Sequence, residues 1–86
     1  MPEISRFYGI IIRMFYDDHA PPHFHAIYGE HELEVGISPI RILYGKAPNR
    51  VQSMVLEWAA LHQVELMKDW DRCRKGEPVK AIAPLD

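Results

Sequence analysis

The spacing of apolar residues changes once along the chain, and that change most constrains the fold. Strand-like alternation occupies residues 6–16, 23–28, 32–37 and 40–44. A helical period then runs from residue 49 to about residue 75, where Gly76 and Pro78 end it. We therefore expect an α+β domain in which a small antiparallel sheet of three to five strands packs on one long C-terminal helix. Residues 80–83 are expected to add a short final strand.

The first strand-like segment, residues 6–16, is rich in aromatic and β-branched side chains and is expected to form one strand. Because side chains alternate across a strand, one of its faces is wholly apolar. We assign that face to the core: Tyr8, Ile10, Ile12, Met14 and Tyr16.

The helical segment is expected to begin with Asn49 as its N-cap, in a capping box with Gln52. Its apolar face should lie on the sheet, although three polar residues stand near the middle of that face: His62, Glu65 and Asp69. The outer face also carries apolar side chains, which suggests a surface for a protein partner: Leu56, Val64 and Met67.

A chain of 86 residues is too short to divide into two cores, so residues 1–86 are expected to form a single domain. The lone Cys73 excludes an internal disulfide. The first residues lack the basic start and apolar run of a signal peptide, and the longest apolar run is too short to span a bilayer. We therefore expect a cytoplasmic protein that does not bind membranes. A net charge of −2, with scattered basic residues, argues against a general nucleic-acid binder, because phosphate contacts need a basic face.

The segment Asp18-His19-Ala20-Pro21-Pro22-His23-Phe24-His25 is the expected functional site. His23 and His25 are two residues apart on a strand, so their side chains point to the same face. Two adjacent imidazoles, with His19 as a third, are suited to a transition metal such as zinc.

Further ligands of such a metal are available nearby. Asp17 or Asp18 would supply a carboxylate oxygen. If the helix covers the histidine face of the sheet, His62 and Glu65 would join the site, since residues three apart are neighbours on a helix. The sequence leaves open which face of the sheet the helix covers.

Two other roles for the histidines stay open. One is cleavage of RNA without a metal, in which His23 and His25 act as the acid–base pair and Arg13 stabilises the phosphate. The other is structural, in which the histidines bond to carboxylates or to the backbone and the prolines only shape a turn.

The residues Phe7-Tyr8-Gly9-Ile10 and the stretch from Met14 to Ala26, centred on Pro-Pro-His-Phe-His-Ala, resemble a bacterial family of short proteins called domain of unknown function 4160. The later stretch Leu-Glu-Trp-Ala-Ala-Leu-His at residues 56–62 and the ending Gly76-Glu77-Pro78 are similar to the same family. The resemblance covers nearly the whole chain. It implies no established catalytic residues.

The resemblance also implies a partner, because such proteins often occur beside another small protein in proposed toxin–antitoxin or regulatory pairs. We therefore expect a protein-binding component of such a pair, with a histidine-rich functional site. The alternatives are a ribonuclease-type toxin and a metal-binding protein that use the same histidines. The expected partner is a small protein encoded next to this one, or a second copy of the chain, and RNA stays possible. Whether the protein is an enzyme is left open.

Overall fold

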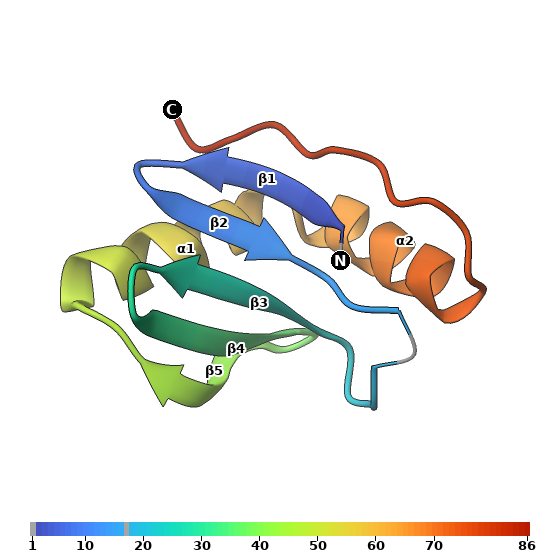
Figure 1. Ribbon diagram of the computed structural model, residues 1–86, viewed down its shortest axis with the longest axis horizontal. Coiled ribbons are helices and arrows are strands. Elements are labelled where there is room, and N and C mark those ends of the chain that lie inside the picture. Colours follow the sequence, from blue (N-terminus) through green and yellow to red (C-terminus); the bar gives the residue numbers. More distant parts are fainter. Residues whose placement is uncertain (1, 17) are drawn as a thin grey trace.

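In the computed structural model, which describes residues 2–16 and 18–86, five strands come first and two helices follow (Figure 1). The expected α+β class is confirmed. The strands are β1 (Glu3–Phe7), β2 (Ile10–Arg13), β3 (His23–Tyr28), β4 (His31–Ile37) and β5 (Ile40–Lys46). They form one antiparallel sheet in the order β1-β2-β3-β4-β5, so each strand pairs with its neighbour in sequence.

The single strand expected over residues 6–16 is wrong, because a tight turn divides it. Tyr8 and Gly9 both have positive φ angles, 50° and 79°, and they join β1 to β2. A two-residue turn of this kind matches the twist of the paired strands, and glycine adopts it without strain. Ile10, Ile12 and Met14 are buried as expected, whereas Tyr8 and Tyr16 are exposed.

The expected long helix is two helices, α1 (Asn49–Leu61) and α2 (Gln63–Arg74), which meet at His62 with φ −123° and ψ 26°. The Gln63 side-chain amide donates to the carbonyl of Ile37 at 2.7 Å and so ties the start of α2 to β4. The expected capping box at Asn49 is also absent. The Gln52 amide instead donates to the Ala47 carbonyl at 2.7 Å.

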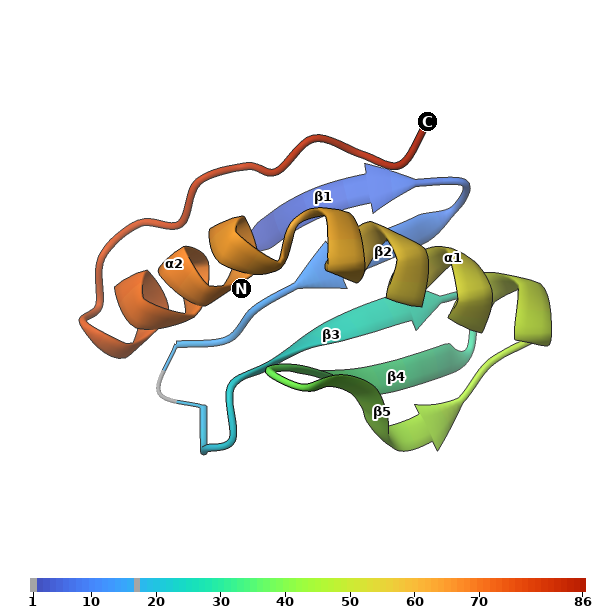
Figure 2. The same ribbon diagram turned by 180° about the vertical axis from the view of Figure 1, so that it is seen from behind.

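Both helices cover one face of the sheet, as Figure 2 shows from the helix side. Phe24 of β3 faces them, because its ring packs edge-on against Trp58 of α1 at 5.7 Å between centroids. The helical face that contacts the sheet is buried at Val51, Val55, Trp58, Leu66, Asp69 and Cys73. By strand alternation, His25 therefore points to the opposite face of the sheet. None of the helices in residues 2–16 and 18–86 is long and apolar enough to cross a bilayer.

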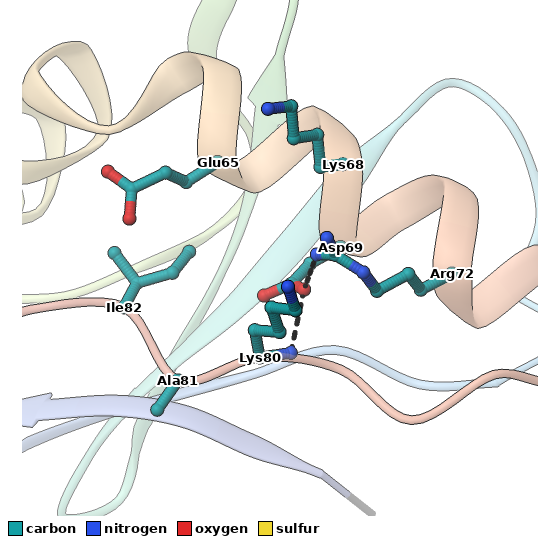
Figure 3. A pocket seen from close by; sticks show the side chains of 7 residues that line it. All are labelled: Glu65, Lys68, Asp69, Arg72, Lys80, Ala81 and Ile82. Atoms are coloured by element: carbon teal, nitrogen blue, oxygen red, sulfur yellow. Dashed lines mark hydrogen bonds and ion pairs between the residues drawn. The ribbon is translucent and has the colours of Figure 1, made fainter.

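The expected final strand is instead an extended segment without a ladder, which returns along α2 and β1 (Figure 1). The backbone amide of Ile82 donates to the Ile4 carbonyl at 2.8 Å, and the Trp58 indole donates to the Ala83 carbonyl at 2.8 Å. The third attachment is Asp69 of α2. Its Oδ1 accepts from the Lys80 amide at 2.9 Å and from Arg72 at 2.8 Å (Figure 3).

Replacing Asp69 by alanine should lower the free energy of unfolding by about 2–4 kcal/mol, because Arg72 and the Lys80 amide lose their buried acceptor. Urea titration followed by tryptophan fluorescence measures this loss. Asp71→Ala, which removes an exposed carboxylate from the same helix, should change the free energy by less than about 0.5 kcal/mol. Equal losses in the two variants would show that Asp69 has no special role.

Candidate metal centre

Three segments bring polar side chains together at the end of the sheet where β3 begins, and Trp70 of α2 borders them. β3 supplies His23 and His25, the segment before β3 supplies Asp18, and β4 supplies acidic residues. Strand register places Glu34 directly across from His25. The ring centroids of His23 and His25 are 5.2 Å apart, so the two imidazoles stand side by side as their spacing predicts.

His23 is the buried centre of this cluster, with a side chain that is 0% exposed. Its Nδ1 lies 2.8 Å from the Pro21 carbonyl oxygen, and since a carbonyl only accepts, Nδ1 carries the proton. In a neutral ring, Nε2 therefore presents a lone pair. That atom lies 2.9 Å from Asp18 Oδ2, yet it forms no hydrogen bond within residues 2–16 and 18–86.

His25 is held between two carboxylates. Its Nδ1 lies 3.0 Å from Glu32 Oε2, and its Nε2 lies 3.1 Å from the same Asp18 Oδ2 that faces His23. The ring of Phe15 packs edge-on against it at 4.4 Å between centroids. A neutral imidazole has one N–H, so it can donate to only one of these two carboxylates.

With both rings protonated at Nδ1, the two Nε2 lone pairs and the Asp18 oxygen would face one another, and a positive charge between them would stabilise that arrangement. Protonating both rings would supply it, but would place two like charges on adjacent imidazoles, one of them fully buried, which is electrostatically costly. One divalent metal ion bound to both Nε2 atoms would satisfy the same contacts with neutral rings. In metal sites, ligating histidines commonly donate their other ring N–H to a carbonyl or a carboxylate, as Pro21 and Glu32 allow here.

The Asp18 carboxylate is suited to hold such an ion. Burial by itself would raise the pKa of Asp18, but the hydrogen bond from His25, the backbone amide of His19 and the neighbouring imidazoles outweigh it and lower that pKa. Asp18 is therefore ionised at neutral pH. Its side chain is 15% exposed, so the negative charge is partly shielded from water.

A second set of potential ligands shares His23. His19, His23 and Glu34 also present one donor atom each within 4.8 Å of one another, as do Asp18, His23 and His25. Glu34 Oε1 lies 3.8 Å from His23 Nε2. The three histidines expected from the sequence are therefore adjacent around Asp18, whereas Asp17 lies outside the described residues.

His62 and Glu65 do not join this cluster. His62 Nδ1 pairs with Glu65 Oε1 at 2.7 Å, at the junction of α1 and α2. α2 contacts the cluster through Trp70, whose ring packs against His23, and this contact does not bring His62 or Glu65 into the donor groups of the described residues. The sequence reading also missed Glu32 and Glu34. A signal for them exists in the sequence, because Gly29-Glu30 between two strand-like segments is typical of a two-residue hairpin turn. Pairing the strands outward from that turn places both carboxylates beside the histidines.

Arg13 stands directly across from His25 on the neighbouring strand β2. It is half-buried, and its Nε is without a hydrogen bond inside the described residues. The acid–base role of His23 and His25 with Arg13 stays a prediction. Three carboxylates close to the imidazoles favour a bound cation over a phosphodiester at this position: Asp18, Glu32 and Glu34.

A family model described as "Domain of unknown function (DUF4160)" matches residues 9–71 of the chain. The resemblance inferred from the sequence is thereby confirmed. The match contains Asp18 and the whole β3–β4 hairpin, so the cluster lies within the family's own domain. No curated protein and no solved structure matches the chain.

In metal-free protein, His23→Ala should lower the free energy of unfolding by about 2–4 kcal/mol, because it opens a cavity against Trp70 and leaves the Pro21 carbonyl without its donor. His19→Ala should have an effect below about 0.5 kcal/mol, since that side chain is 73% exposed. Urea titration in the presence of a chelator compares the two. An unaffected His23→Ala variant would contradict the buried position of this ring.

Proposed function

We propose that this protein, which belongs to the family called domain of unknown function 4160, binds one divalent transition-metal ion through His23, His25 and Asp18. One observation carries the proposal. The Nε2 atoms of both histidines converge on a single Asp18 oxygen, while both Nδ1 atoms already have acceptors. Zinc is the first candidate because it favours imidazole nitrogen with a carboxylate oxygen.

The separations of the donor atoms suit such an ion. Zinc bonds to nitrogen and oxygen ligands are about 2.0–2.1 Å long, so tetrahedral ligands lie about 3.3 Å apart. The two Nε2 atoms are 2.9 and 3.1 Å from Asp18 Oδ2, so a small outward shift admits the ion. Two ligands of one metal ion direct their lone pairs at the ion and do not hydrogen-bond to each other. His23 Nε2 has this arrangement, since it forms no hydrogen bond with the nearby Asp18 oxygen, whereas His25 Nε2 is in hydrogen-bonding position with it.

Protein purified without a histidine tag should bind one equivalent of zinc, and the double variant His23→Ala, His25→Ala should lose it. Isothermal titration calorimetry and elemental analysis after dialysis measure the affinity and the stoichiometry. We expect the double variant to bind at least about 100-fold more weakly, because it lacks two of three ligands and their outer hydrogen bonds.

His31→Ala and His62→Ala are matched controls for this experiment. His31 stacks on Tyr28, and His62 pairs with Glu65. Each control variant therefore removes one imidazole that lies outside the cluster. Both controls should retain the wild-type stoichiometry. Wild-type protein that binds no zinc, cobalt or nickel, or a double variant that binds as the wild type does, would refute the metal site.

We also propose a second role as the protein-binding component of a small toxin–antitoxin-like or regulatory pair. The observation that favours it is two large apolar side chains exposed beside the junction of the helices, Leu61 at 67% and Val64 at 68%. Next to them a groove is lined by Leu61, His62, Ala83, Pro84 and Leu85. Leu56 and Met67, named from the sequence with Val64, are half-buried and contribute less surface.

Co-expression with the product of the adjacent gene tests this role. The double variant Leu61→Asp, Val64→Asp should abolish co-purification, because it places two charges in an apolar contact. Ser53→Asp, which adds a charge at an exposed position two turns before Leu61 on α1, is the control and should retain the complex. A neighbouring protein that never co-purifies with the wild-type chain, or that binds both variants equally, would contradict this surface.

A further inference from the structure

His19 stands at the solvent side of the histidine cluster. Its ring centroid is 5.2 Å from that of His23, and its side chain is 73% exposed. The side chains of His23 and His25 are only 0% and 11% exposed. The cluster therefore has an inner part that the fold holds in place and an outer part that water reaches.

The protonated and unprotonated nitrogens of the His19 ring are arranged as in His23. Its Nδ1 lies 3.2 Å from the Ala20 carbonyl, which can only accept, so Nδ1 carries the proton and Nε2 presents a lone pair. That Nε2 lies 3.8 Å from Asp18 Oδ1. The Nε2 atoms of all three imidazoles thus lie within 4 Å of an Asp18 oxygen, and His19 forms a compact donor set with His23 and Glu34.

We infer that His19 is an additional, exchangeable ligand of the ion, so that a small external nitrogen or oxygen donor can replace it. The inference rests on the proposed metal site. Imidazole, carboxylate, phosphate or hydroxide have the donor chemistry that fits this position, because each offers one compact lone pair to a divalent ion.

The difference between the ligands follows from how each is held. Packing against Trp70 and the Pro21 carbonyl holds His23, so binding an ion requires little further ordering. The exposed His19 side chain retains more freedom and loses more conformational entropy when it binds. The outer bond is therefore the first to open. Glu34, with a side chain that is 24% exposed, lies within reach of the same side of the ion.

Cobalt(II) is the probe for this inference, because its visible absorption spectrum reports the number and type of its ligands. Wild-type protein and His19→Ala should both bind one cobalt ion, and we expect the variant to bind roughly 10-fold more weakly. Its spectrum should differ from that of the wild type. Millimolar imidazole should then restore the wild-type spectrum in the variant by filling the vacant position.

His31→Ala serves as the control, with an unchanged spectrum before and after imidazole. If His19→Ala binds cobalt with a wild-type spectrum, or if imidazole does not restore the altered spectrum, His19 is not an exchangeable ligand and the inner site alone stands. If wild-type protein binds no cobalt, the metal site itself fails and the inference fails with it. The two failures are therefore distinguishable.

Discussion

The imidazole of His23 connects the core of this protein to its candidate metal site. Its ring is fully buried and packs 5.2 Å from Trp70 of α2 between centroids, while its Nδ1 donates to the Pro21 carbonyl just before β3. The orientation of the ring is therefore fixed from two sides. Its Nε2 is left facing Asp18, on the segment that precedes the strand. The segment, the sheet and the helical layer thus meet at one side chain.

That orientation gives the cluster its chemistry. The Nδ1 of His23 donates to a carbonyl, and the Nδ1 of His25 faces a carboxylate that can accept from it. When His25 donates from Nδ1, both Nε2 atoms present lone pairs toward the ionised carboxylate of Asp18. A positive charge at the point where these three donors meet would stabilise that arrangement. A divalent ion supplies it without two adjacent imidazolium ions, which would repel each other in a partly buried site. The same arrangement of acceptors behind the rings is common in metal sites.

Sequence patterns predicted the α+β class and the pairing of His23 with His25, because strand alternation and Gly and Pro positions are local signals. The Tyr8-Gly9 turn was missed, since aromatic and β-branched residues continue through it and conceal the break. The division of the helical segment at His62 has no proline or glycine to mark it. The face that the helices cover depends on long-range packing of Phe24 against Trp58, which no local pattern encodes. The acidic partners of the histidines likewise depend on cross-strand register.

Long-range ¹H–¹⁵N NMR of the histidine rings, with and without zinc, tests the metal site at His23, His25 and Asp18 most directly. This measurement reports which ring nitrogen carries a proton and which binds a metal. We expect one equivalent of zinc to move the Nε2 signals of His23 and His25 to metal-bound positions, while their Nδ1 atoms stay protonated and His31 is unchanged. Zinc bound through Nδ1, or two rings that stay doubly protonated at neutral pH and ignore zinc, would contradict it.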